Sequence, residues 1–499
     1  MVGSQRRPRR IGPRADRPAP VTRSVAARQT TIPPVLPLQL SPEEFRRLAD
    51  RVAAATTEFL ATLDSRPIFP PTSGPQTAAL FEGPAPEEGM GEAAFDALAA
   101  ITEHARAGNG RLFAYVVGSG EPVGALADLY ASVLNQNVTA WRSAPSAVTV
   151  ERTVVGWLAQ AVGCDGFIGS LTSGGSSANL MGLAMAREAT APANQHGAKA
   201  GVVYASEEVH MSVPKALALL GLGRANLRLV PVDKRFRMRP DALEAAIVED
   251  RRAGRLAIAV VASAGTVGTG AIDPLAEVAT IAHANALWLH VDGAYGALAA
   301  LAVPERLAGL ALADSLSVDG HKWLYQPLDC SALLYRDAQL ARETFAYTGD
   351  YAKTLTADPV EGFAFFEESI ELSRRFRALK LWLSLRYHGL ARFRQAIGND
   401  LRHAQLLAEL VQAEPSLELL APVELSAVCF RWAGGPAAAL DERNREILRC
   451  VVRRGRVGLS NATVGGRFAL RACIVNHRTT DQDVAAVIDE VLAAAKETA

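Results

Sequence analysis

The chain has 499 residues, with 52 basic and 52 acidic side chains, so its formal net charge is zero. This balance argues against a nucleic-acid-binding protein, which usually carries a clear basic excess. The 49% of hydrophobic residues suits a globular protein, and no apolar run reaches the roughly 18 residues of a transmembrane helix. At about 150 residues per domain, the length predicts roughly three folding units.

Cysteine use points to a reducing compartment. The sequence contains five cysteines, and no two of them form a C-x-x-C pair or lie at metal-ligand spacing. The odd number and the spacing argue against a disulfide framework and against a structural zinc site. The N-terminal arginines are not followed by the apolar core of a signal peptide. We therefore expect a cytoplasmic protein without a metal site.

Residues 1–40 differ in composition from the rest of the chain. They hold eight arginines, one acid and several prolines, with too few apolar side chains to offset the entropy that folding would cost. This composition predicts a disordered tail. An arm that binds nucleic acid or membrane, and a transit peptide, are the alternatives. A solvated tail is favoured because the segment has no lysine and no aromatic residue.

An N-terminal helical segment is expected over residues 41–120. The run Ser41-Pro42-Glu43-Glu44 is a capping box, with a serine cap, proline at the first helical position and glutamate three residues after the cap. Apolar residues then recur on one helical face from Phe45 to Leu63, and a proline-rich connector follows over Pro67–Pro86. Such a helix needs another surface to cover it, and a second subunit could supply that surface.

Short apolar runs alternate with helix-like stretches over residues 121–379. Because long segments of helical periodicity separate the runs, they predict a large α/β domain with a mainly parallel sheet. A smaller C-terminal domain is expected over residues 380–499, ending in a helix capped by Thr480. The strand candidates are Gly166–Leu171, Gly201–Ala205, Leu227–Val232, Leu256–Ala262, Ala286–Val291, Ser315–Val318 and Cys330–Tyr335.

Two motifs at strand ends carry residues suited to catalysis. Lys322 lies between His321 and Trp323, where desolvation would favour the neutral amine that Schiff-base chemistry needs. Asp292 ends a buried strand, where a carboxylate is costly unless it has a cationic partner such as a protonated pyridine nitrogen. The structural alternatives are a lysine stem packed on Trp323 and an aspartate that caps the next helix.

A glycine-rich turn and a histidine complete the set. Residues 172–179 (TSGGSSAN) join a strand candidate to a helix, whose first N–H groups could hold a phosphate. The turn lacks the lysine of a P-loop, and residues 265–270 lack the spacing of a dinucleotide-binding turn. His210 follows a strand candidate, at the end where open α/β sheets bind ligands. A histidine that is only a satisfied polar residue is the alternative.

Together these features describe one cofactor. Pyridoxal 5'-phosphate (PLP) has a phosphate for the glycine-rich turn, a pyridine nitrogen for Asp292, an aldehyde for Lys322 and a flat ring for His210. A chance occurrence of all four features in this chain order is improbable. The sequence therefore predicts a PLP-binding enzyme.

From about Ser41 to its end, the sequence resembles the group II PLP-dependent amino-acid decarboxylases, which include aromatic-L-amino-acid, glutamate, histidine and diaminobutyrate decarboxylases. The resemblance implies fold type I, with a mostly parallel seven-stranded sheet in the large domain and a small α+β C-terminal domain. It also implies decarboxylation of an L-amino acid, with an aromatic substrate favoured. The motifs that carry it are TSGGSSAN, VVYASEEVHMSV, ASAGTVGTGAIDP, LWLHVDGAYG, ADSLSVDGHKW, DCSALLYRD and LSRRFRALKLWLSLRYHG.

The resemblance assigns roles to individual residues. Lys322 would bind the cofactor covalently, Asp292 would keep the pyridine nitrogen protonated, and His210 would stack on the ring. Lys322 and His210 would thus be catalytic as well as cofactor-binding. The other implied cofactor contacts are Gly175, Ser176 and Ser315 at the phosphate, His321 beside the lysine, Thr266 near the ring and Ala294 beneath it.

The family also has a mobile loop whose catalytic tyrosine protonates the substrate carbon after carbon dioxide leaves. Tyr351, in the run Asp350-Tyr351-Ala352-Lys353, is the matching position here. In the family this loop reaches into the neighbouring subunit, so the resemblance implies a homodimer. The alternative for Tyr351 is an ordinary loop tyrosine.

Some segments depart from the aromatic-specific members, so the substrate stays open. Leu134–Trp141 is less apolar than in those members, and Val116–Gly118 matches loosely. One alternative function is decarboxylation coupled to oxidative deamination, which yields an aldehyde; the presence of Tyr351 and His210 favours the amine instead. The other is a non-catalytic PLP-binding scaffold, which an intact Lys322 disfavours.

Overall fold

The computed structural model describes residues 38–347 and 358–498. The chain divides into two compact units, one ending at Ala54 and the other beginning at Ala55. Helix α1 (Pro42–Thr62) starts with the predicted capping box: the Glu44 N–H donates to Ser41 Oγ (3.1 Å) and the Ser41 N–H donates to Glu44 Oε2 (2.8 Å). All but the last three residues of the predicted tail lie outside the described residues.

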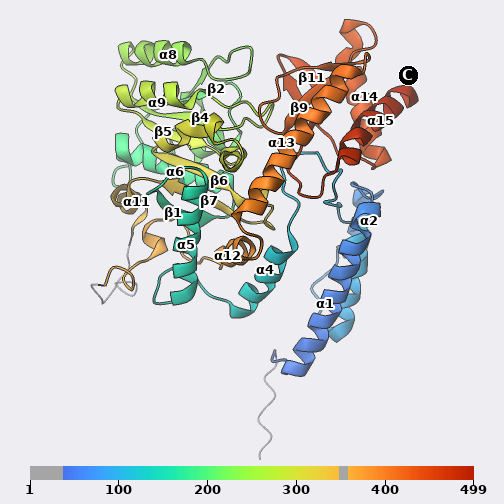
Figure 1. The fold of residues 1–499 in the computed structure, drawn as a ribbon. Coiled ribbons are helices and arrows are strands. Elements are labelled where there is room, and N and C mark those ends of the chain that lie inside the picture. The colour runs from blue at the N-terminus through green and yellow to red at the C-terminus, as the bar shows by residue number, and fades with distance from the viewer. Residues whose placement is uncertain (1–37, 348–357, 499) are drawn as a thin grey trace, which may run out of the picture. The chain divides into compact units, whose positions relative to one another are not determined.

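A seven-stranded sheet forms the centre of the second unit (Figure 1), in the order β1-β7-β6-β5-β4-β2-β3. Strands β2 to β6 run parallel, whereas β7 is antiparallel to both of its neighbours, so the predicted mostly parallel sheet is confirmed. The strands are β1 (Ile168–Thr172), β2 (Val202–Ser206), β3 (Leu227–Val230), β4 (Ala257–Ser263), β5 (Trp288–Asp292), β6 (Ser315–Asp319) and β7 (Ser331–Tyr335).

Helices cover both faces of this sheet, as a parallel sheet requires. Side chains alternate along each strand, and neighbouring residues of β4 accordingly enter different cores. Val260 packs with α5 (Pro145–Ala161), α8 (Pro240–Arg252) and α9 (Leu275–Ala284). Val261 packs with α6 (Gly175–Thr190) and α7 (Ser212–Leu219) on the other face. Continuous apolar runs therefore became strands buried on both sides.

The segment between α1 and α5 contains three short α-helices: α2 (Gly74–Phe81), α3 (Ala97–Glu103) and α4 (Pro122–Leu134). Helix α2 lies inside Pro67–Pro86, which was predicted to be a plain connector, so that prediction was wrong over these residues. Ser73 caps the helix and forms a capping box with Gln76, and a proline lies in the first turn, where its missing N–H is not needed.

A four-stranded antiparallel sheet, in the order β10-β11-β9-β8, belongs to the C-terminal part of the chain. Helix α15 starts at the predicted Thr480 cap, where the Asp483 N–H donates to Thr480 Oγ1 (3.3 Å). The predicted boundaries after residues 40, 120 and 379 stay predictions. The elements are β8 (Leu417–Leu419), β9 (Ala427–Trp432), β10 (Ser460–Val464), β11 (Arg467–Cys473), α12 (Ala378–His388), α13 (Leu390–Ala413), α14 (Leu440–Arg454) and α15 (Asp481–Glu497).

None of the described helices is long and apolar enough to cross a membrane.

Candidate active site

The carboxyl ends of several strands meet at one edge of the large sheet. Strands β4, β5 and β6 are parallel and end at Ser263, Asp292 and Asp319. Strand β1 has the same direction as β6, because both are antiparallel to β7, and it ends at Thr172. A cavity of about 270 Å³ opens at this edge and is lined by Ser173, Gly174, Gly175, Ser176, Asn179, His210, Ser263, Gly265, Thr266, Val267, Asp292, Ala294, Tyr295, Asp319, His321, Lys322 and Leu328.

Lys322 is held in this cavity by an ion pair with Asp319. The short helix α10 (Gly320–Trp323) follows β6 directly, and Lys322 Nζ lies 2.9 Å from Asp319 Oδ2. Nε2 of His321 lies 3.5 Å from the same oxygen. Burial acts to raise the pKa of Asp319, but Lys322 and His321 outweigh it and hold that pKa below its usual value. Asp319 therefore stays ionised and fixes the lysine beside the cavity.

Asp292 is fixed from a neighbouring helix. His290 and Asp292 lie two residues apart on β5, so both side chains point to the same face, where Asn179 of α6 contacts both. The Asn179 amide donates to Asp292 Oδ2 (2.9 Å), and its carbonyl lies 3.0 Å from His290 Nε2. Burial lowers the pKa of His290 to about 4, so the ring is neutral at pH 7. Its neutral Nε2–H can therefore donate to Asn179.

The other oxygen of Asp292 is also bound. Ser317 Oγ donates to Asp292 Oδ1 (3.2 Å), and the Ala294 N–H donates to the same atom (3.2 Å). Asn179 and Ser317 were missed as functional residues in the sequence. Asn179 closes the TSGGSSAN motif, but nothing in the sequence pairs it with Asp292. Ser317 lies opposite Asp292 in the β5–β6 register, which only the sheet order reveals.

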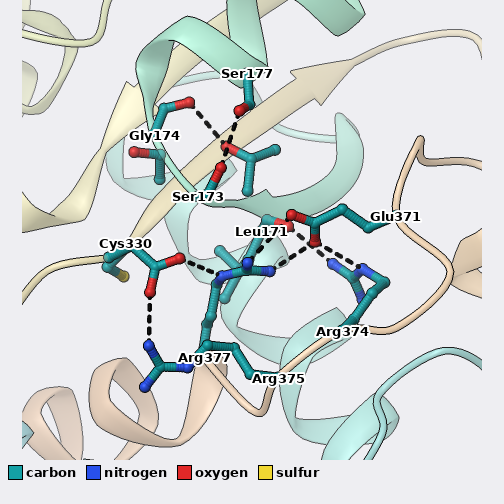
Figure 2. A network of polar contacts seen from close by, with 12 residues as sticks. Leu171, Ser173, Gly174, Ser177, Cys330, Glu371, Arg374, Arg375 and Arg377 are labelled. Carbon is teal, nitrogen blue, oxygen red and sulfur yellow. Dashed lines mark hydrogen bonds and ion pairs between the residues drawn. The ribbon is translucent and has the colours of Figure 1, made fainter. Parts of the chain in front are cut away.

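The glycine-rich turn forms a close cradle between β1 and α6. A Cβ atom on Gly175 would lie 2.9 Å from the Ala294 Cβ and 3.1 Å from both carboxylate oxygens of Asp319, so no larger residue fits without a shift. Ser173 Oγ lies 2.9 Å from Ser177 Oγ across the turn, as Figure 2 shows. Helix α6, with 16 residues, begins at this turn, so its first N–H groups lie there. Free N–H groups at a helix N-terminus bind phosphate in many proteins.

Of the other predicted residues that the structure describes, all but one reach the same cavity. His210 lines it with Nδ1 2.8 Å from Ser212 Oγ, and burial lowers the pKa of His210. Thr266 lines it as well, with Oγ1 3.1 Å from Thr269 Oγ1. Ala294, His321 and Ser176 complete the lining. The cavity thus gathers residues from five separate motifs of the sequence.

Ser315 is the exception. It lies at the first residue of β6, whereas Asp319 and the cavity lie at the last, and its side chain is buried. Its hydroxyl is already engaged, because Trp288 Nε1 donates to it (2.8 Å) and His290 Nδ1 lies 2.8 Å away. The structure therefore does not bring Ser315 to the phosphate cradle; it supports His290 instead. Tyr351, the predicted loop tyrosine, lies outside the described residues.

A larger hollow of about 810 Å³ lies elsewhere, against α5, α12 and α13. Its lining is mostly aliphatic, with Trp157, Leu307 and Leu385 among it, and its titratable residues are two arginines, Arg386 and Arg394. Among the residues that the structure describes, no carboxylate or histidine lines it, so these residues offer no acid–base pair for catalysis. Size alone therefore does not mark the active site of this protein.

The residues of the smaller cavity fit PLP. An amine, a buried carboxylate, a neutral imidazole and a glycine cradle at a helix N-terminus match the aldehyde, pyridine nitrogen, ring and phosphate of that cofactor. Lys322, Asp292 and His210 come from three different motifs, and the fold places all three around one space. The cradle at Gly175 leaves room for a phosphate only because no side chain is present there.

Comparison with known proteins agrees with this geometry. Residues 85–433 match the pyridoxal-dependent decarboxylase conserved domain. Among relatives, an aromatic-L-amino-acid decarboxylase of Bacillus atrophaeus is 34% identical over 92% of this chain and 97% of its own. An L-2,4-diaminobutyrate decarboxylase of Rhizobium meliloti is 34% identical over 74% of this chain and 75% of its own, and a phenylacetaldehyde synthase of Petunia hybrida is 29% identical over 87% and 91%.

Solved structures share the fold. The structure of Oryza sativa TDC with PLP and tryptamine superposes with a TM-score of 0.86 at 27% identity, covering 92% of this chain and 99% of the other. This confirms the predicted fold type I and the predicted cofactor. The chain belongs to the pyridoxal-dependent decarboxylase family, and it is a PLP-dependent amino-acid decarboxylase.

Proposed function

We propose that this enzyme decarboxylates an aromatic L-amino acid to the corresponding amine and carbon dioxide. The observation that carries the proposal is the charge inventory of the cavity. Among the described residues that line it, the cation is Lys322 and the acids are Asp292 and Asp319. All three are committed, because Lys322 pairs with Asp319 until it binds the cofactor and Asp292 is held by Asn179 for the pyridine nitrogen.

An uncharged side chain suits this lining better than a charged one. Diaminobutyrate would bring a second ammonium and glutamate a second carboxylate, and burying either without a partner is costly. Val267 and Leu328 are the apolar side chains at the cavity that a substrate ring could contact. The likeness to an aromatic-L-amino-acid decarboxylase over 92% of this chain points the same way.

Each residue of the site would have one task. Lys322 would hold the cofactor covalently until the substrate amine takes its place on the cofactor. Asp292 would keep a proton on the pyridine nitrogen. Bound PLP would supply the electron sink for cleavage of the bond between the α-carbon and the carboxylate of the substrate. His210, uncharged because burial lowers its pKa, would lie against the ring face without repelling the pyridinium. Tyr351 would return a proton to the substrate carbon.

Contacts to the cofactor complete the assignment. Gly175 and Ser176 would bind the phosphate through the first N–H groups of α6. Three further lining residues would make the remaining contacts: Thr266 near the ring, Ala294 beneath it and His321 beside the lysine. Ser315 is left out of this set, because its hydroxyl is buried at the far end of β6.

We also propose that the enzyme is a homodimer. Helix α4 buries Gly124, Ala127 and Ala131, and it contacts α12. Its opposite face is apolar and at least half exposed, with Leu126, Leu129, Tyr130 and Val133 along it. A contiguous apolar face of this kind on a folded chain is typical of a protein interface. A second copy is the partner that the predicted exchange of the Tyr351 loop would require.

Sedimentation tests the dimer. Wild type should sediment at twice the chain mass of 53.0 kDa, and a Leu129→Glu/Val133→Glu double variant should sediment at the monomer mass. The matched control is Leu219→Glu, which places the same charge on an exposed leucine of α7. A monomeric wild type, or a double variant that stays dimeric, would contradict the role of α4.

Products identify the reaction. Purified enzyme is incubated with a panel of aromatic, acidic and diamino L-amino acids, and carbon dioxide, amines, aldehydes and peroxide are measured. We expect amine and carbon dioxide in equal amounts, and faster turnover for an aromatic substrate than for diaminobutyrate or glutamate. Aldehyde with peroxide would establish the oxidative alternative instead. PLP binding without carbon dioxide from any substrate would establish the non-catalytic scaffold.

The five cysteines also bear on location. All of them are free and buried, and two of them, Cys429 and Cys473, lie on paired strands without forming a disulfide. Thiols that stay unpaired suit a reducing compartment. We therefore propose that the enzyme works in the cytoplasm.

A further inference from the structure

Asp319 is a carboxylate of the active site that the proposed catalytic scheme leaves without a role. Its residue is 2% exposed, and its oxygen Oδ2 is engaged by Lys322 at 2.9 Å and by His321 Nε2 at 3.5 Å. Among the described residues, Oδ1 has no hydrogen-bond partner although it is buried. An unsatisfied carboxylate oxygen in the interior is costly. Its presence at a binding site therefore indicates a missing partner that donates or shares a proton.

The direction of the carboxylate identifies that partner. Both of its oxygens lie 3.1 Å from the place where a Cβ atom on Gly175 would be. Gly175 is the first residue of α6, and its cradle is the proposed phosphate site. An anion bound there would lie against Asp319, so two negative groups would share one desolvated space. Like charges at such a distance favour protonation of one of them.

We propose that Asp319 is part of the phosphate-binding site and that it takes up a proton when the cofactor binds, which it then shares between Oδ1 and a phosphate oxygen. The step forms one O–H bond with a proton from solvent, and no electrons are transferred. The proposal rests on the proposed phosphate role of Gly175 and Ser176. It gives Asp319 two states: a carboxylate paired with Lys322 in the free protein, and a proton donor in the loaded enzyme.

The groups around Asp319 support a change of state on binding. Burial alone acts to raise its pKa, and Lys322 and His321 of α10 hold that pKa down. A hydrogen bond from Ser331 of β7 also acts to lower the pKa of Asp319, and the Ser331 hydroxyl lies 3.3 Å from His321 Nδ1. Across the cavity, the charge of Asp319 acts to raise the pKa of His210, and Asp292 lines the same space. Once Lys322 is tied covalently to the cofactor, its ion pair with Asp319 is weakened. The burial that raises the pKa of Asp319 is then less fully offset, so protonation of Asp319 becomes more favourable.

Proton counting tests the proposal directly. Apo-protein is titrated with PLP by calorimetry in two buffers of different ionisation enthalpy, which gives the number of protons taken up per cofactor bound. Asp319→Asn keeps the shape of the side chain but cannot titrate. We expect wild type to take up about one proton more than this variant. Because wild type must take up this proton to bind PLP, its affinity for PLP should decrease as the pH rises above neutrality. Relative to the affinity of Asp319→Asn, the decrease should be up to about tenfold per pH unit.

Pyridoxal, which lacks the phosphate, distinguishes the effect of the phosphate on Asp319 from the effect of Lys322. With pyridoxal, wild type and Asp319→Asn should take up equal numbers of protons. If the one-proton difference persists with pyridoxal, it belongs to Lys322 and the phosphate proposal is overturned. Equal uptake with PLP also overturns it. If PLP binds no more tightly than pyridoxal to either protein, the cradle at Gly175 is not a phosphate site, and the proposed function of that turn fails with it.

Two further variants guard the measurement. Asp314→Asn changes a carboxylate immediately before β6, where Oδ2 accepts from the Leu289 N–H outside the cavity, and it should keep the extra proton. Loss of the extra proton in this control would also overturn the assignment to Asp319. Asp319→Ala cannot titrate either and replaces the asparagine variant if that one does not fold. Folding of each variant is checked by circular dichroism before titration.

Discussion

Glu151 and Arg374 form an ion pair in which neither side chain has any exposed surface, with 2.5 Å between Glu151 Oε1 and Arg374 Nη2. Both groups also bind Leu171: its N–H donates to Glu151 Oε1 (2.9 Å), and its carbonyl accepts from Arg374 Nη2 (2.8 Å). Figure 2 shows Arg374 beside Leu171, near the glycine-rich turn. Since β1 is an edge strand, these two side chains supply the hydrogen bonds that another strand would have given.

The same arginine connects other parts of the site. Arg374 Nη1 donates to the Val138 carbonyl (2.9 Å), and the Arg374 N–H donates to Asn137 Oδ1 (2.9 Å). Nearby, Glu371 accepts from Arg377 (2.7 Å) and Arg377 also donates to Asp329 (2.7 Å). The segment around Arg374 therefore connects the strand before the glycine-rich turn to Asn137–Val138, a stretch in which this sequence departs from the aromatic-specific pattern.

Glu151→Gln should destabilise the protein strongly, because it removes the buried counter-charge of Arg374 and leaves only the longer, partly exposed pair with Glu371 at 3.8 Å. Removing one partner of a buried ion pair typically costs about 3–5 kcal/mol. The free energy of unfolding in urea measures the loss. The matched control is Asp50→Asn, which breaks an exposed pair with Arg46 and should cost less than about 1 kcal/mol. A loss for Glu151→Gln as small as that of the control would contradict the role given to the pair.

Lys322→Ala should abolish the covalent attachment of the cofactor. The purified wild type should be yellow, and reduction with borohydride should leave PLP fixed to the peptide that contains Lys322. The alanine variant should bind PLP without a borohydride-stable link. Lys234→Ala, at an exposed position, is the control and should keep both the colour and the link. A reduced adduct at another lysine in the Lys322→Ala variant would show that the assignment is wrong.

His290 should make the protein less stable in mild acid. Burial lowers the pKa of His290 to about 4 in the folded protein, against 6.5 for a free histidine. The unfolded chain therefore binds a proton first as the pH falls, so the free energy of unfolding should decrease between about pH 6.5 and pH 4. The neutral ring also holds Asn179, which in turn holds Asp292. Acid should thus weaken cofactor binding over the same range.

Unfolding curves at several pH values measure this contribution. His290→Gln should show a shallower fall in unfolding free energy below pH 6.5 than wild type does, with a difference on the order of a few kcal/mol near pH 4. His196→Gln, at an exposed position, should leave the pH dependence unchanged. Identical pH profiles for wild type and His290→Gln would mean that His290 does not titrate as its burial requires.

Local patterns in the sequence predict much of this structure. All seven strand candidates became strands, and the caps at Ser41 and Thr480 start helices, because strand runs and capping boxes depend on neighbouring residues only. The places of Lys322 and Asp292 followed from the same logic. A residue that ends a parallel strand lies at the ligand-binding edge wherever that strand is placed in the sheet.

Pairs that are distant in the sequence could not be predicted. Glu151 and Arg374 are 223 residues apart, and the sequence around either residue does not indicate that the other is its partner. Asn179 meets Asp292 only because α6 crosses the face of β5. The phosphate contact expected for Ser315 has a different origin. That role came from the family resemblance, whereas the rule for strand ends argues against it, because Ser315 begins the strand that Asp319 ends.

Tyr351→Phe should change the product more than it changes substrate binding. Tyr351 lies outside the described residues, and its role as the proton donor comes from the family resemblance. Phenylalanine keeps the ring but removes the hydroxyl, and loss of a general acid typically slows the assisted step by about 100- to 10,000-fold. Amine formation should collapse, with aldehyde rising in the presence of oxygen, while the KM for substrate changes little. Product analysis under air and under nitrogen measures both effects.

Mixing subunits tests whether this tyrosine acts across a dimer. Tyr351→Phe and Lys322→Ala homodimers should each be nearly inactive. In a heterodimer, one of the two sites would combine an intact Lys322 with an intact Tyr351 from the other chain, so activity should recover to as much as half that of wild type. Because a tyrosine acting within its own chain could never meet an intact lysine in this mixture, purified heterodimers without activity would exclude the exchange. Normal amine output from Tyr351→Phe alone would instead remove the tyrosine from the reaction.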